Sequence, residues 1–161
     1  FAKVRRSFPD AQLTIVGDNR THPKQDLATT ILGEDLETSV SLQSYVSEAQ
    51  LAQLYRQATV FVFLSEYEGF GLTPLEAMSA GVPVVVGDTP VARELYGDAA
   101  LFVPIANVNA TANAIRTLLT DITVRERQRQ LASTLLENFS WTRAANATLE
   151  VLELAAARKS T

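Results

Sequence analysis

Residues 59–87 read TVFVFLSEYEGFGLTPLEAMSAGVPVVVG, and this stretch predicts the fold. The apolar run at its start is continuous rather than alternating, as expected of a central strand buried on both faces of a parallel sheet. A glycine-containing loop leads into a helix over residues 74–80, with Pro74 at its first position. Residues 82–87 read as the next strand. The stretch is therefore a strand, helix, strand unit of an α/β protein.

The same alternation continues on both sides of this unit. Residues 11–18 and 40–46 read as strands around a helix over residues 24–37, and residues 99–104 read as a fifth strand. Five strands separated by helices predict a doubly wound parallel sheet with helices on both faces. One domain over residues 1–161 accounts for the whole chain, which has no linker or repeat.

Helix starts and faces can also be read from the sequence. Ser47 and Gln50 form a capping box for a helix that places Tyr55 on its apolar face. The last third of the chain, from about Asn109, is helical and has a new helix start at Ser140.

Composition excludes several classes of protein. The chain is 47% hydrophobic and 20% charged, which fits a globular domain, and its net charge of −4 leaves no broad basic surface for nucleic acid. It has no cysteine, so it has neither disulfides nor thiolate metal sites. No apolar run approaches the ~20 residues that a membrane-spanning helix needs. We expect a soluble, cytoplasmic domain.

The loop before the predicted helix has the features of an anion site. It follows a strand at the edge of the sheet where doubly wound proteins bind ligands. Gly69 and Gly71 allow backbone angles that let N–H groups converge, and the following helix N-terminus adds partial positive charge. A phosphate is the ligand that such a loop favours.

Two glutamates flank this loop, and each has two interpretations. Glu76 completes a capping box with Thr73, or it binds a ligand. Glu68 is a solvated loop residue, or it too binds a ligand. Carboxylates repel a phosphate unless they accept hydrogen bonds from hydroxyl groups on the same molecule. A diphosphate between a ribose and a hexose meets this condition, so the ligand interpretation predicts a nucleotide sugar.

The stretch SEYEGFGLTPLEAMSAGVPVVVGD, residues 65–88, resembles the donor-site signature of retaining glycosyltransferases of family 4, also called group 1. The resemblance runs from about Leu13 onward and includes Phe139 to Trp141, which read FSW. It implies a GT-B fold, in which two Rossmann-like domains face each other, and this chain resembles the C-terminal, donor-binding half. The N-terminal, acceptor-binding half would be missing.

The resemblance also implies roles for individual residues. Glu76 matches the second glutamate of the E-x7-E motif, which accepts hydrogen bonds from the ribose, and Glu68 matches the first, the catalytic-site glutamate beside the hexose. In the family, backbone amides of one loop meet the sugar and the diphosphate. That loop corresponds to Gly69, Phe70, Gly71 and Leu72, with Thr73 at the phosphate end. Tyr45 and Val46 match the segment that contacts the nucleobase through main-chain atoms.

The implied reaction transfers a hexose, mannose or glucose, from a donor such as GDP-mannose or UDP-glucose. We expect no cofactor and no metal, because the sequence has no Asp-x-Asp pair. The family's first donor-domain strand, with the Arg and Lys that hold the diphosphate, would lie before Phe1, so we expect this chain alone to be inactive. Membrane association would come only through the missing half. The alternatives are an epimerase or phosphorylase of the same fold, and a non-catalytic nucleotide-sugar binding module.

A few other residues have simpler interpretations. His22 is the sole histidine, which we expect at the surface and which cannot form a metal site alone. We expect Trp141 to pack at the start of the last helix. Arg125, Arg127 and Arg129 are expected to form a solvated helix face.

Overall fold

The computed structural model describes residues 1–19, 23 and 25–159, so His22 lies outside the described residues. In chain order the elements are α1 (Ala2–Arg5), β1 (Leu13–Val16), α2 (Leu27–Gly33), β2 (Val40–Gln43), α3 (Glu48–Gln57), β3 (Phe61–Phe63), α4 (Leu72–Ser79), β4 (Val84–Gly87), α5 (Pro90–Tyr96), the 3-10 turn η1 (Gly97–Ala99), β5 (Ala100–Val103), α6 (Val108–Thr120), α7 (Ile122–Leu136) and α8 (Trp141–Lys159). Each of the five predicted strands is present.

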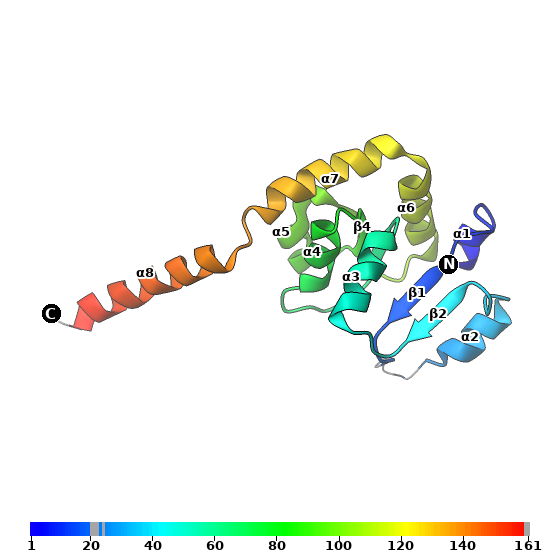
Figure 1. The fold of residues 1–161 in the computed structure, drawn as a ribbon, viewed down its shortest axis with the longest axis horizontal. Coiled ribbons are helices and arrows are strands. Elements are labelled where there is room, and N and C mark those ends of the chain that lie inside the picture. Colours follow the sequence, from blue (N-terminus) through cyan, green and yellow to red (C-terminus); the bar gives the residue numbers. More distant parts are fainter. Residues whose placement is uncertain (20–22, 24, 160–161) are drawn as a thin grey trace.

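Every strand pair is parallel, which confirms the α/β class, and the hydrogen bonds divide the strands into two groups. β1 pairs with β2 (Figure 1), with Leu13 opposite Val40. β3, β4 and β5 pair in that order, with Val84 of β4 between Phe61 and Ala100. Over the ranges that the structure describes, no strand pairing joins the first group to the second.

The core lies on both faces of β4. Val84 and Val86 face a cluster built with α3, α4, α5 and α7, whereas Val85 faces Leu118 of α6 on the other side. All three valines are at most 1% exposed. Helices therefore cover both faces of the three-stranded sheet, as predicted.

The prediction that residues 59–65 form the central strand is wrong for the strands described. Phe61 and Val62 of β3 do pack on opposite faces, which explains the continuous apolar run. However, β3 is an edge strand and pairs only with β4. The central position belongs to β4, because it has a hydrogen-bonded neighbour on each side.

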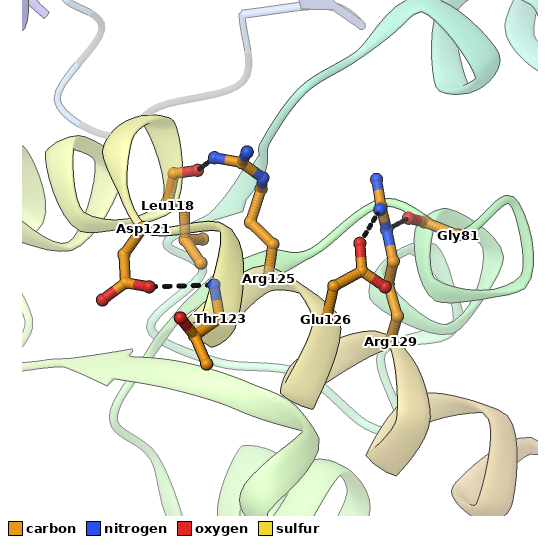
Figure 2. A network of polar contacts seen from close by, with 7 residues as sticks. All are labelled: Gly81, Leu118, Asp121, Thr123, Arg125, Glu126 and Arg129. Atoms are coloured by element: carbon orange, nitrogen blue, oxygen red, sulfur yellow. Dashed lines mark hydrogen bonds and ion pairs between the residues drawn. The ribbon is translucent and has the colours of Figure 1, made fainter.

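The expectation that the basic residues of α7 form a solvated face is wrong for Arg125, which is half-buried, whereas Arg129 is exposed and also binds a backbone carbonyl (Figure 2). Arg125 donates a hydrogen bond of 2.7 Å to the Leu118 carbonyl, and Arg129 donates one of 2.8 Å to the Gly81 carbonyl. Arg127 is exposed, as predicted. Two guanidinium groups thus fasten α7 to α6 and to the end of α4, because backbone carbonyls there lack helical partners.

α8 extends away from the rest of the chain at the C-terminal end (Figure 1). Its first residue, Trp141, is 92% exposed, so the prediction that this side chain packs is wrong. The helix does begin where predicted, because the Ser140 hydroxyl accepts a hydrogen bond from the Arg143 N–H. Among the described residues, no helix has the length and apolar character to cross a membrane.

Candidate functional site

A small pocket lies at the carboxyl ends of β3 and β4, at the edge of the sheet where the sequence predicted a ligand. Its lining comes from the end of β3, the loop after it, the end of β4 and the start of α5. The lining residues are Phe63, Ser65, Glu68, Phe70, Val86, Gly87, Thr89, Val91, Ala92 and Tyr96. No lysine or arginine lines this pocket of the described chain. The glycine loop, which carries Glu68 and Phe70, therefore meets the segment from Gly87 to Tyr96 at one site.

The glycine loop turns into α4 at Gly71, which has a φ of +86°. The Tyr96 hydroxyl donates a hydrogen bond of 2.6 Å to the Gly71 carbonyl. A Cβ at position 71 would collide with that hydroxyl. Both the backbone angle and the close approach of Tyr96 therefore require glycine here.

α4 begins two residues earlier than predicted, and of the two interpretations of Glu76 the capping box is wrong. Its N-cap is Gly71, no side chain caps it, and Thr73 is already its second residue. Thr73 therefore cannot act as the N-cap partner of Glu76. Since the first backbone N–H groups of a helix have no helical acceptor, those of Leu72 and Thr73 are left for solvent or a ligand.

Glu76 is instead bound by a residue of another helix. Its Oε2 atom accepts a hydrogen bond of 3.1 Å from the hydroxyl of Tyr55 on α3. Burial of Tyr55, together with the hydrogen bond to Glu76 and its charge, raises the pKa of that hydroxyl well above its usual value. The hydroxyl therefore remains a donor, and the exposed Glu76 carboxylate is oriented by it.

Glu68 is half-buried in the pocket, beside Tyr96. Burial, and to a lesser extent the negative charge of Glu68, raises the pKa of Tyr96 to about 12. Tyr96 thus interacts with the loop in two ways. Its hydroxyl donates a hydrogen bond to the Gly71 carbonyl, and the charge of Glu68 acts on the same hydroxyl. Glu68 faces a pocket rather than open solvent, which favours the ligand interpretation over the solvated loop residue.

The remaining predicted donor-binding residues lie in the glycine loop, at the start of α4 and in the loop after β2. Gly69 and Leu72 are exposed, and Leu72 is the first residue of α4. Tyr45 and Val46 lie between β2 and α3, and the Tyr45 side chain is 85% exposed. Within the described part of the chain, no hydrogen bond or ring contact joins Tyr45 or Val46 to the glycine loop, so the structure does not bring them into the pocket.

Sequence reasoning missed three residues that hold the loop and its glutamates. Tyr55 was predicted only as part of an apolar helix face, and Tyr96 and Phe139 were given no role of their own. Phe139 makes an edge-to-face contact with Phe70, with ring centroids 6.0 Å apart. For the two tyrosines the signal in the sequence was the hydroxyl, because a buried tyrosine hydroxyl requires a hydrogen-bond partner, and for Phe139 it was membership of the FSW segment.

Asp88 and Arg93 lie near the pocket but are already paired with each other. Arg93 donates to both carboxylate oxygens of Asp88, at 2.7 and 2.8 Å, and lies over the ring of Phe102. The hydrogen bond from Arg93 lowers the pKa of Asp88. The Arg93 guanidinium is thus engaged within the domain.

Known proteins resemble this chain both in sequence and in fold. A family model described as glycosyl transferases group 1 matches residues 1–134. O-antigen chain mannosyltransferase B of Escherichia coli is 38% identical over 110 residues, which cover 68% of this chain and 29% of that protein. The chain therefore spans less than a third of the length of this relative.

Two solved structures show the same fold. Sucrose-phosphate synthase from Thermosynechococcus elongatus superposes with a TM-score of 0.77 and 26% identity, over 98% of this chain and 41% of that one. The C-terminal domain of a group 1 family protein from Francisella tularensis gives a TM-score of 0.71 and 20% identity, over 86% of this chain and 76% of that one. The chain belongs to the glycosyl transferases of group 1, and its fold is that of the C-terminal half of a GT-B protein.

Proposed function

We propose that this chain is the donor-binding domain of a retaining glycosyltransferase, which transfers a hexose from a nucleotide sugar to the hydroxyl group of an acceptor. The bond between the anomeric carbon and the diphosphate oxygen breaks, and its electron pair leaves with the nucleoside diphosphate. The acceptor oxygen forms the new bond, and its proton passes to the leaving diphosphate. The carrying observation is the placement of Glu68 and Glu76 on either side of the Gly71 turn.

The backbone N–H groups at the Gly71 turn favour binding of an anion there. The N–H groups of Leu72 and Thr73 start α4 without a side-chain cap, and a helix N-terminus carries partial positive charge. The diphosphate of the donor would lie there. Pro74 has no N–H, so Leu72 and Thr73 supply the donors of the first turn together with the amides of the loop from Gly69.

The two carboxylates suit the hydroxyl groups on each side of a diphosphate. Tyr55 occupies Oε2 of Glu76, and a carboxylate accepts several hydrogen bonds, so Glu76 retains acceptor capacity for ribose hydroxyls. Glu68 lies in the pocket with Phe70, where the hexose would bind. Tyr45 and Val46 would contact the nucleobase through their main chain.

The proposal includes one further strand between β1 and β3. In a doubly wound sheet of order 3-2-1-4-5-6, the second and third strands pair on one side of the first strand, and the fourth, fifth and sixth pair on the other. The two groups here, β1 with β2 and β3 with β4 and β5, reproduce this order with the first strand left out. That strand would carry the basic residues that hold the diphosphate, since the pocket lining has none.

We infer that mannose is the hexose ahead of glucose, with GDP-mannose as the first donor to test. The relative from Escherichia coli is a mannosyltransferase by name, which supports this choice. We further propose that the 161-residue chain alone binds nucleoside diphosphates weakly and transfers no sugar, because the acceptor side and the basic strand lie outside it.

Calorimetry on the full-length protein tests the proposal, with nucleoside diphosphates and their sugars as ligands. We expect Glu76→Gln to weaken binding of every nucleoside diphosphate by roughly tenfold or more, because hydrogen bonds to a charged group contribute ~1.5–3 kcal/mol. Glu68→Gln should weaken mainly the binding of the intact nucleotide sugar. Glu66→Gln, in the same loop but outside the motif, is the matched control. Parent-like binding by Glu76→Gln would contradict the assigned role of Glu76.

A further inference from the structure

The glycine loop between β3 and α4 is held by contacts at three places. The Ser65 hydroxyl donates to the Tyr67 carbonyl at 3.1 Å, and Tyr96 binds the Gly71 carbonyl. Between these two points, the ring of Phe70 meets the ring of Phe139 edge to face, at an interplanar angle of 84°. Phe139 is thus the contact that reaches the middle of the loop from a distant part of the sequence.

Phe139 is itself anchored to the folded body. Its N–H donates to the Leu136 carbonyl at 3.0 Å at the end of α7, and Leu136 packs against the main core cluster. Arg143 of α8 contacts the Glu137 carbonyl and the Asn138 side chain, both at 3.3 Å. The short segment between α7 and α8 is therefore fixed at both ends, and it presents the Phe139 ring to the loop.

We propose that Phe139 is a positioning residue for the donor site, acting through Phe70. Phe70 is 43% exposed and Phe139 37% exposed, so each residue is more than half covered. Phe70 lines the same pocket as Glu68 and is bonded to Gly69 and Gly71, two residues that by themselves allow many backbone conformations. Holding the Phe70 ring restricts this segment to the conformation in which Glu68 faces the pocket.

This inference rests on the proposed function, which assigns no role to the FSW segment, and it gives that segment one. Trp141, the aromatic of that segment with the larger ring system, is 92% exposed, whereas Phe139 makes the contact with the loop. α8 starts two residues after Phe139 and leaves the body there (Figure 1). The donor loop and α8 thus share one anchoring segment.

The test uses the full-length protein and four single variants: Phe139→Leu, Phe139→Tyr, Phe70→Leu and Trp141→Leu. Calorimetry measures affinity for GDP-mannose and UDP-glucose, and hydrogen exchange measures the peptide over residues 66–72. We expect Phe139→Leu to accelerate exchange in this peptide severalfold and to weaken binding of the nucleotide sugar about two- to tenfold, the range for loss of an aromatic pair. Phe139→Tyr retains a ring and should match the parent, as should the exposed control Trp141→Leu.

The double variant Phe70→Leu/Phe139→Leu separates positioning from general stability. If Phe139 acts through Phe70, the second substitution adds no further loss of affinity to the first. Additive losses, or equal acceleration of exchange in β4, would overturn the inference. Parent-like affinity and exchange in Phe139→Leu would overturn this inference and leave the proposed function standing. A parent protein that binds neither nucleotide sugar would overturn the proposed function, and this inference with it.

Discussion

The unit of β3, β4 and β5 and the unit of β1, α2 and β2 are built from similar apolar residues but are buried to very different extents. Val85 at the centre of β4 is 0% exposed, whereas Leu42 of β2 is 47% exposed and Leu32 of α2 is 63% exposed. α2 has no buried residue. The difference follows from pairing, because β4 has neighbours on both edges and helices on both faces, and β1 with β2 has one partner each.

This contrast shows which unit can hold a site rigidly. Every residue that lines the pocket belongs to the segment from β3 to α5, in the well-packed unit. The β1 and β2 unit contributes no residue to this lining, and Tyr45 and Val46 lie in the loop that follows β2. α1, which precedes β1, packs against α6, the helix beneath the β3, β4 and β5 unit. Val4 of α1 is 1% exposed, and Lys3 donates a 2.7 Å hydrogen bond to Asn109 of α6. We therefore expect substitutions in the two units to have unequal effects.

The largest difference is expected between two matched leucines. Leu118→Ala removes a side chain that is 0% exposed beneath β4, and should lower the free energy of unfolding by about 2–5 kcal/mol. Leu32→Ala, in α2, should change it by less than about 0.5 kcal/mol. Urea unfolding followed by circular dichroism measures both, because the sole tryptophan lies exposed on α8 and reports poorly on the core. Equal losses would remove the contrast between the units.

Two glycines with positive φ give the next comparison. Gly71→Ala requires a strained backbone and displaces the Tyr96 hydroxyl, so we expect a loss of roughly 2–3 kcal/mol. Gly17, after β1, has a φ of +119° with open space around it, so Gly17→Ala should cost only the strain, roughly 1–2 kcal/mol. Unfolding in urea gives both values. A loss from Gly17→Ala as large as that from Gly71→Ala would contradict the role of Tyr96.

Two tyrosines then sharpen the comparison at the level of binding. Tyr55→Phe removes the hydrogen bond that orients Glu76, and should weaken nucleotide binding about fivefold, which corresponds to ~1 kcal/mol. Tyr45→Phe should bind like the parent, because the resemblance assigns a main-chain contact to that segment. Calorimetry on the full-length protein measures both variants. The Tyr55→Phe loss should disappear in a Glu76→Gln background, and its persistence there would assign Tyr55 another role.

The smallest effect is expected from a chelator, because neither unit has a group of side chains suited to hold a metal ion in the part of the chain that the structure describes. Among residues 1–19, 23 and 25–159, no three acidic, histidine or cysteine side chains are grouped so as to hold a metal ion. We expect the full-length protein to keep the proposed transfer activity in excess chelator. Loss of activity that returns on addition of manganese or magnesium would contradict this prediction.

The sequence by itself determined the features that depend on near neighbours. The capping box of Ser47 and Gln50 is formed, because both partners lie on one helical turn. The apolar run of β3 and the spacing of Glu68 and Glu76 around a glycine loop predicted a strand and a site at its carboxyl end. These are short-range patterns, which a local rule can describe.

Only the tertiary structure decided what each glutamate contacts. Thr73 and Glu76 satisfy the same local rule as Ser47 and Gln50, yet their capping box is not formed, since α4 starts earlier, at the Gly71 turn held by Tyr96. Tyr55 reaches Glu76 across 21 residues of sequence. Phe139 reaches Phe70 from the far end of α7. Such contacts depend on how α3, α5 and α7 pack around β4, and side chains far apart in the sequence meet only when that packing is complete.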